Sequence, residues 1–347
     1  MSNQGNNPDP RVLRRFVFTI VGVCAISLVL IAGTNIVVDP YGDREIGAYP
    51  ALQRNSRQIK LELIGNHQDV DTLILGSSRV MQFFPEDVDE VTQGVAFNAG
   101  VNSGNFFDAE ALYRYWTEKE KRRFRRVILG IDLESFSPMV GIDQRLQDVD
   151  ELMAFVPSDI GGARKGSDAR FFVDLSLDKT KRSIEVLRYE YIKGWPDEKL
   201  QFRDDGTVAY LAVEEEIERG VFDLSVKIKK SKEEYRGRFH GFSRLAAHAK
   251  QTLTRFTESL RHDGVELVAF LTPLHPEVIE ALGQEHYQER LGDANAFLKD
   301  LADQHGFHYF DASELSSFGG DPSGFVDGAH ITRANAKLIL KKLFESR

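Results

Sequence analysis

The sequence has a single cysteine, Cys24, among its 347 residues. One cysteine excludes an intramolecular disulfide framework and any zinc or iron–sulfur site built from several cysteines. The chain also lacks the glycine fingerprints of a P-loop and of a dinucleotide-binding loop. His305 and His308 share one segment, but on a strand their side chains would point to opposite faces, and no carboxylate cluster with ligand-like spacing surrounds them. The sequence therefore predicts no metal and no organic cofactor.

The chain has no excess of positive charge. The chain has 44 Lys and Arg against 53 Asp and Glu, which gives a formal net charge of -9. Nucleic-acid binding depends on Lys and Arg side chains at the phosphates. The acidic balance therefore argues against a nucleic-acid partner, although it identifies no substrate.

Residues 16–38 form a run without any charged side chain. As a helix this run is about 35 Å long, enough to cross the hydrocarbon core of a bilayer. Arg11, Arg14 and Arg15 precede it, so the positive-inside rule keeps residues 1–15 in the cytoplasm and exports the rest. We expect a single-pass protein of the cytoplasmic (inner) membrane that contacts lipid through residues 16–38. Its exported part would be periplasmic or extracellular.

A cleaved signal peptide is the alternative interpretation of this run. The run exceeds the about 7–15 apolar residues of a signal peptide, and no clear cleavage site follows it. Cys24 is not expected to accept a lipid, because Val23 stands where a lipoprotein signal needs a small residue. An uncleaved anchor is therefore favoured. It places Cys24 in the membrane and leaves the exported part without cysteine, as suits an oxidising compartment.

Short apolar runs rich in β-branched residues alternate with helical patterns after the anchor. They occupy residues 71–76, 95–98, 126–133, 265–273 and 307–311. Such strands indicate an α/β domain with a parallel sheet covered on both faces. Apolar periodicity predicts helices over 242–260, ended by Gly264, and over 332–344. We expect residues 39–70 to be a linker and residues 71–347 to be the α/β domain, with an insertion at about 137–241.

The expected insertion carries two local signals. Asp205-Gly206 lies between Phe202 and Val208, a pattern typical of a β-hairpin turn. Residues 227–238 form a charged run of mixed sign, which favours a solvated helix face or loop over an anion site. We expect the insertion to shape a substrate cleft or a partner surface.

Three segments follow or lie near the ends of predicted strands, where sites form in open α/β sheets. The first is Gly76-Ser77-Ser78. A turn between strand and helix can present a serine hydroxyl where free N–H groups favour a developing oxyanion. The same residues are also common in ordinary turns and helix caps. The segment is not a G-x-S-x-G elbow, because Val80 occupies the last position.

The second segment, 98–104, follows the next predicted strand and contains Asn98, Gly100, Asn102 and Gly104. Glycines allow close backbone approach and leave N–H groups pointing into a cleft, and asparagine side chains add donors. An ordinary polar loop explains the same composition.

The third segment is Asp327-Gly328-Ala329-His330, shortly before the last predicted helix. A catalytic histidine needs a carboxylate on Nδ1 to fix its tautomer and orientation, and this spacing supplies both groups on one loop. A surface or capping role for His330 is the alternative.

Together, the order and placement of the three segments resemble the SGNH/GDSL hydrolase superfamily. The resemblance implies a three-layer SGNH-like (flavodoxin-like) α/β fold. It assigns the nucleophile to Ser78, the general base to His330 and its orienting carboxylate to Asp327. It also implies an oxyanion hole formed by the N–H groups of Ser78 and Gly104.

One block departs from the superfamily pattern. Its members take an asparagine donor from a G-x-N-D turn, whereas this chain reads Leu129-Gly130-Ile131-Asp132. Asn102 or Asn105 replaces this donor, or the hole has only two donors. Loss of one oxyanion donor costs about 10²–10³ in rate. Some membrane-anchored members also depart from the hydrolase pattern, namely the D-alanyl transfer and alginate acetylation proteins. This chain resembles them more closely than it resembles the hydrolases.

Two functions follow. The first is an envelope O-acyltransferase or esterase acting on a glycan or related polymer, with a glycan or an acyl-donor protein as partner. The second is a non-catalytic envelope protein that keeps the fold and binds polysaccharide or a membrane partner. Candidate cleft residues are Arg79, Asn98, Asn105 and His275. We expect Arg79 to be exposed on the first helical turn rather than paired with an anionic substrate group.

Overall fold

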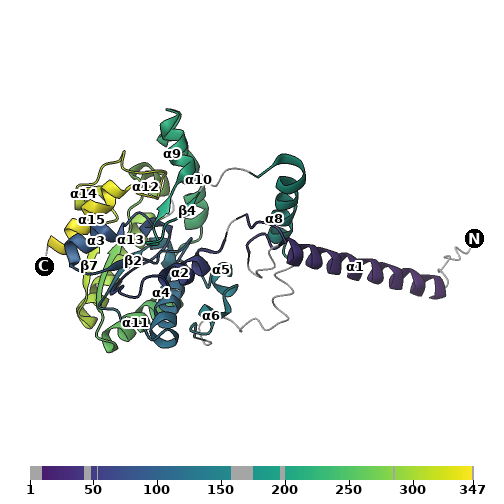
Figure 1. Cartoon of the computed structure of the whole chain (residues 1–347), viewed down its shortest axis with the longest axis horizontal. Coiled ribbons are helices and arrows are strands. Elements are labelled where there is room, and N and C mark those ends of the chain that lie inside the picture. The colour runs from purple at the N-terminus through teal and green to yellow at the C-terminus, as the bar shows by residue number, and fades with distance from the viewer. Residues whose placement is uncertain are drawn as a thin grey trace, which may run out of the picture. The chain divides into compact units, whose positions relative to one another are not determined.

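The computed structural model describes residues 10–42, 48–52, 54–157, 175–195, 200–283 and 286–345. The chain divides into two compact units (Figure 1). Unit 1 comprises residues 1–55 and 163–197, and unit 2 comprises residues 56–162 and 198–347. Of the segment predicted to be cytoplasmic, 1–15, residues 1–9 lie outside the described residues.

Unit 1 is built around one long helix, α1 (Pro10–Val38). By length and composition, Arg11–Val38 is apolar enough to cross a membrane, and only 6% of its most apolar window is buried. An apolar helix with so little burial is not the core helix of a soluble domain. The other elements described in unit 1 are α8 (Leu177–Arg188) and the π-helical turn η4 (Tyr189–Lys193).

Unit 2 contains a five-stranded sheet in which all neighbouring strands are parallel. Its strands are β1 (Thr72–Leu75), β2 (Ala96–Asn98), β3 (Arg126–Ile131), β6 (Glu266–Leu271) and β7 (His308–Asp311). Their spatial order is β2-β1-β3-β6-β7, so the direction of winding reverses between β1 and β3. Ligands of such sheets bind beyond the carboxyl ends of the strands at this reversal.

Helices form most of the remainder of unit 2. The longer ones are α2 (Ser56–Ile64), α3 (Pro85–Thr92), α4 (Phe106–Arg114), α9 (Leu211–Glu218), α10 (Leu224–Phe239), α11 (Ala247–His262), α13 (Tyr287–His305) and α15 (Arg333–Glu345). The shorter segments are η1 (Ser78–Val80), η2 (Tyr115–Lys119), η3 (Leu133–Phe136), α5 (Gln144–Gln147), α6 (Asp150–Met153), α12 (Pro276–Leu282) and α14 (Leu315–Phe318). A separate antiparallel hairpin pairs β4 (Gln201–Phe202) with β5 (Val208–Ala209).

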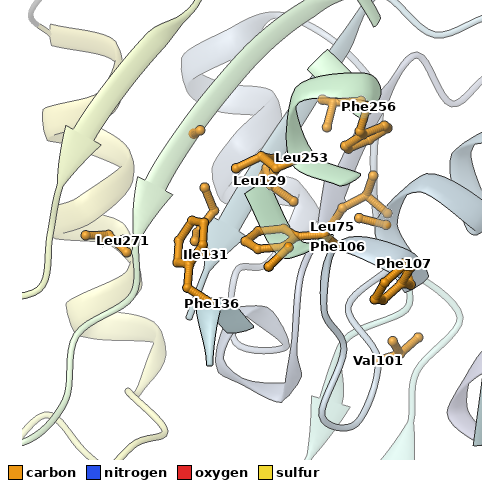
Figure 2. Packing of buried hydrophobic residues seen from close by; sticks show 14 of the residues in the cluster. Leu75, Val101, Phe106, Phe107, Leu129, Ile131, Phe136, Leu253, Phe256 and Leu271 are labelled. Carbon is orange, nitrogen blue, oxygen red and sulfur yellow. The ribbon is translucent and has the colours of Figure 1, made fainter. Parts of the chain in front are cut away.

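The two faces of the sheet carry separate hydrophobic clusters. On β1, Leu73 and Leu75 belong to the cluster that includes side chains of α4, α11 and α13, whereas Ile74 belongs to the cluster with α3 and α15. Successive residues of a strand point to opposite faces, so a strand covered by helices on both sides is apolar throughout. Figure 2 shows part of the first cluster, where the ring centroids of Phe106 and Phe136 are 4.9 Å apart.

The predicted strands are all confirmed, with ends shifted by no more than two residues. The hairpin is confirmed as well, since Phe202 pairs with Val208 across the Asp205-Gly206 turn. The predicted start of the helix over 242–260 is wrong. Helix α11 begins at Ala247, because Phe242 instead packs from the preceding loop onto Phe239, with ring centroids 5.6 Å apart.

The division into units differs from the predicted domain boundaries at two places. Residues 56–64 of the predicted linker form α2 within unit 2, because Ile59 and Ile64 are buried there. Part of the predicted insertion at 137–241, residues 163–197, groups with unit 1. Residues 158–174 and 196–199 of that insertion lie outside the described residues. The rest of it belongs to unit 2 and supplies the hairpin and α10.

Lys60 on α2 is completely buried. Its Nζ donates to the backbone carbonyl of Asn98, 2.7 Å away, and to that of Gly206. One ammonium group thus joins α2 to the end of β2 and to the hairpin turn. Burial lowers the pKa of Lys60 to about 7, and the nearby charge of Asp205 opposes this effect only in part.

Replacing Lys60 by Met is expected to flatten the pH dependence of stability. Between about pH 7 and the ordinary pKa of 10.5, the unfolded chain binds one more proton at this site than the folded chain. The free energy of unfolding of the natural chain should therefore rise with pH, by up to about 1.4 kcal/mol per pH unit from this group. Urea unfolding of the detergent-solubilised chain at pH 7 to 10 measures it.

The matched control is Lys341→Met, because Lys341 is an exposed lysine on α15. This control should keep the pH slope of the natural chain. Equal slopes for Lys60→Met and the natural chain would contradict the buried-lysine account.

Candidate active site

The candidate site is built from the segments that follow β1 and precede α15. After Leu75, Gly76 has φ of +146°, and a Cβ on it would lie 2.7 Å from the carbonyl oxygen of Gly130. Only glycine fits this turn, which leads directly into η1. Ser77 caps η1, since its Oγ accepts the backbone N–H of Arg79 at 3.1 Å. Because Ser77 provides the cap, the hydroxyl of Ser78 is not used for it. Ser78 is half-buried at the first position of η1.

Three side chains predicted to act together are brought together. Ser78 Oγ lies 2.8 Å from His330 Nε2, and His330 Nδ1 lies 2.8 Å from Asp327 Oδ2. A carboxylate only accepts hydrogen bonds, so Nδ1 carries the proton in this pair and Nε2 of the neutral ring accepts the Ser78 hydroxyl. The arrangement is that of a nucleophile, a base and an orienting acid.

Asp327 is fixed by the backbone as well as by His330. Its Oδ1 accepts the N–H groups of Ala329 at 2.8 Å and of His330 at 2.9 Å. Burial alone would raise the pKa of Asp327. The imidazole of His330 and the two backbone donors outweigh burial, so the pKa lies well below its ordinary value. Asp327 is therefore an ionised carboxylate when it accepts the hydrogen bond from His330 Nδ1–H.

Neighbouring elements hold the loop that carries the pair. The N–H of Gly328 donates to Ser231 Oγ of α10 at 3.1 Å, and its carbonyl accepts the N–H of His275 at 2.9 Å. His275 itself is buried, its Nδ1 accepts the N–H of Glu277, and its ring packs against Phe325. His275 thus supports the loop through its backbone and caps α12, and it does not line the cavity at Ser78.

The two backbone N–H groups predicted to form an oxyanion hole differ, because only one of them is already hydrogen-bonded within the protein. The N–H of Ser78 has no acceptor among the described residues, which leaves it available to a ligand. The N–H of Gly104 instead donates to the carbonyl of Val101 at 3.0 Å, within a turn. A Cβ on Gly104 would lie 2.5 Å from the carbonyl oxygen of Gly76, so the turn packs tightly against the strand end that leads to Ser78. Ser103, beside Gly104, lines the cavity.

Two of the three candidate asparagines, Asn98 and Asn105, bind backbone groups through their side chains. Asn98 is completely buried, and its Nδ2 donates to the carbonyls of Val80 and Phe83. Asn105 caps α4 through Oδ1, and its Nδ2 donates to the carbonyl of Gly141. Asn102 is half-buried, with its backbone N–H donating to the hydroxyl of Ser56. Within the described residues, none of the three lines the cavity at Ser78.

The expectation of an exposed Arg79 is wrong. Arg79 is 4% exposed, and its guanidinium donates to Glu134, to the hydroxyl of Tyr235 at 2.8 Å and to Thr272 Oγ1 at 3.0 Å. Burial alone would lower the pKa of Arg79, but the carboxylates of Asp132 and Glu134 outweigh burial and hold it well above its ordinary value. The partners come from η3, from α10 and from the residue that follows β6, so adjacent sequence does not reveal them.

Replacing Arg79 by Met is expected to lower the free energy of unfolding by about 3–5 kcal/mol, because it removes the cation beside the buried carboxylates of Asp132 and Glu134 and leaves Glu134 with the more distant Arg238, at 3.8 Å. Chemical denaturation of the detergent-solubilised chain measures the change. Arg219→Met is the control, since Arg219 pairs with Glu215 on an exposed helix face and the loss should stay below about 1 kcal/mol. Equal losses for the two variants would show that the buried network contributes no special stability.

A cavity of about 50 Å³ opens at Ser78 and His330, with Asp132 and one face of α10 among its walls. That face presents Ser231, Glu234, Tyr235 and Arg238. These positions are spaced i, i+3, i+4 and i+7, which is one side of a helix. The sequence carries this spacing, but a run of mixed charges favours a solvated surface.

Tyr210 is a second residue that the sequence analysis missed. It follows β5, and its ring lies 6.1 Å from the imidazole of His330, centroid to centroid. Its hydroxyl is buried and has no hydrogen-bond partner among the described residues. Burial raises the pKa of Tyr210, and the charge of Asp327 adds to the shift. A neutral phenol therefore covers one side of the candidate base.

No group of three or more metal-ligating side chains occurs among the described residues. The chain matches no protein-family model, and no curated protein matches it.

Proposed function

We propose that this protein is a membrane-anchored, exported serine acyl-ester enzyme of SGNH type. It acts as an O-acyltransferase or esterase on an envelope glycan or related polymer. The observation that carries the proposal is the pair of 2.8 Å contacts that links Ser78, His330 and Asp327. The strand order, with its reversal beside the Ser78 turn, and the chain order of the three segments support an SGNH-like fold.

The first half of the reaction forms an acyl-enzyme. His330 Nε2 takes the hydroxyl proton of Ser78, and Oγ attacks the ester carbonyl carbon to give a tetrahedral oxyanion. Asp327 stabilises the imidazolium that forms. As the oxyanion collapses, the bond to the leaving alcohol breaks and His330 returns the proton to that oxygen. In the second half, water or a glycan hydroxyl gives its proton to His330 and attacks the acyl carbon to give a second tetrahedral oxyanion. As this oxyanion collapses, the bond between the acyl carbon and Ser78 Oγ breaks, and His330 returns the proton to Oγ.

The groups around Ser78 determine which donors are available to the oxyanion and how large an acyl group the cavity can hold. The N–H of Ser78 is the available donor, and a second comes from the 102–104 turn if a substrate opens the Gly104–Val101 hydrogen bond. A cavity of about 50 Å³ holds only a few water-sized spheres. This size favours a short acyl group over a long hydrocarbon chain.

The alternative function, non-catalytic binding of polysaccharide or a membrane partner, is favoured by the engaged N–H of Gly104 and by Asp132 in place of an asparagine donor. The short distance between Ser78 and His330 argues against it, because a binding site has no need of an aligned base.

Cells that carry Ser78→Ala in place of the natural chain test the proposal. The readout is the ester-linked acyl content of the envelope glycan. Loss of acylation would indicate a transferase, and excess acylation would indicate an esterase. Unchanged acylation, with the variant present at its normal level in the membrane, would favour the binding function.

A further inference from the structure

Unit 1 carries an apolar and aromatic face whose position follows from α1. Five large side chains on α8, η4 and the residues just after them are exposed: Leu177, Ile184, Tyr191, Ile192 and Trp195. Their exposed fractions run from 36% for Trp195 to 79% for Leu177. A row of this kind on a soluble surface usually marks a binding face.

The face is held at the end of α1. Ala32, Asn35 and Val38 on one side of the last two turns of α1 are buried, whereas the large apolar side chains before them are exposed. Asn35 Nδ2 donates to Thr180 Oγ1 of α8 at 2.9 Å, and α8 lies beside this end of α1 (Figure 1). About 20 helical residues cross the hydrocarbon core. A span that starts after Arg15 therefore ends where α8 is attached.

The spacing on α8 mixes apolar and basic side chains on one side. Leu177 and Ile184 are seven residues apart on α8, which keeps them within about 20° of one another around the helix, and Tyr191 follows on η4. Lys181 and Arg188 stand four residues after the first two and are also exposed. Long basic side chains beside apolar ones can bury their stems and keep their charges in water.

These features match the boundary between lipid and water. Tyr and Trp concentrate at that boundary because their rings are apolar and their tips are polar. Lys and Arg side chains are attracted to the negative charge of an anionic membrane surface. The indole ring of Trp195 has such a polar tip, and its Nε1–H donates to Glu190 at 2.8 Å.

We infer that the α8–η4 face, made by Leu177, Lys181, Ile184, Arg188, Tyr191, Ile192 and Trp195, lies in the headgroup region of an anionic bilayer, on the side where α1 leaves the membrane. The face acts as an interfacial platform beside the anchor. The inference rests on α1 spanning the membrane and is independent of any catalytic activity.

Tryptophan quenching by brominated lipid tests this platform. The full chain is reconstituted into vesicles of phosphatidylcholine and phosphatidylglycerol whose acyl chains carry bromine near the headgroup. The chain has two tryptophans and Trp116 is completely buried, so quenching of Trp195 should remove up to about half of the emission. Trp195→Phe should abolish the quenching, and Ile184→Glu should reduce it at least about twofold.

Ile217→Glu is the matched control, because Ile217 lies on α9 in unit 2 and is 57% exposed, close to the 52% of Ile184. It should leave the quenching unchanged. Reaction of Cys24 with an impermeant maleimide reports separately on α1. Protected Cys24 without quenching of Trp195 would overturn the platform alone, and reactive Cys24 would overturn the anchor and the platform together.

Discussion

Ser78→Ala is expected to abolish turnover of a short acyl ester such as p-nitrophenyl acetate. Removal of the serine of an aligned triad costs about a million-fold in kcat, which leaves a rate close to the detection limit of the assay. The protein should remain folded, because Ser78 is only half-buried and the change removes one hydrogen bond, worth about 1 kcal/mol. Initial rates and a denaturation curve on the same preparations measure both effects.

Ser77→Ala is the matched control for this prediction. Ser77 has the same side chain one residue earlier, yet its hydroxyl caps η1 and makes no contact with His330. Loss of the cap should cost about 1 kcal/mol of stability and leave turnover largely intact. Equal loss of turnover in the two variants would mean that the turn, rather than the Ser78 hydroxyl, is what matters.

Asp327→Asn is expected to lower kcat about 10⁴-fold, as a wrong histidine tautomer does. Oδ1 of Asp327 accepts two backbone N–H groups, so the asparagine oxygen must keep that place. The amide NH₂ then faces His330 Nδ1 and donates to it. The ring proton moves to Nε2, which can no longer accept the Ser78 hydroxyl. Initial rates with the same ester measure this loss.

Asp321→Asn provides the comparison, because Asp321 likewise accepts hydrogen bonds from a nearby residue, Ser323, but lies away from the cavity. It should change kcat by no more than about twofold, as expected for a surface position. If the Asp327→Asn variant retained most of its activity, this result would contradict the proposal that His330 acts as a base oriented by Asp327.

Strands and the local motif were predictable because their signals lie in short stretches of sequence. β1 and β3 are continuous apolar runs, and the spacing of Asp327 and His330 places both groups on one loop. The identity of the partner serine needed one further step, which the resemblance supplied. In the structure, Ser77 caps η1 and Ser78 faces His330.

Features that depend on distant segments were not predictable. The partners of Arg79 come from residues 55, 156 and 193 positions away, so no local pattern reveals that it is buried. Lys60 was not singled out because a lone lysine on a short helix usually faces solvent. The mixed charges of α10 favour a solvated face, and the contacts of Ser231 with Gly328 and of Tyr235 with Arg79 make one face of the helix part of the site.

Covalent labelling tests the central claim most directly. The detergent-solubilised natural chain is treated with a fluorophosphonate, and the modified peptide is identified by mass spectrometry. The triad predicts a single phosphonyl adduct on Ser78, lost in His330→Ala and retained in Ser77→Ala. A folded chain that takes no adduct at Ser78 under conditions that label a serine esterase would contradict the proposed nucleophile.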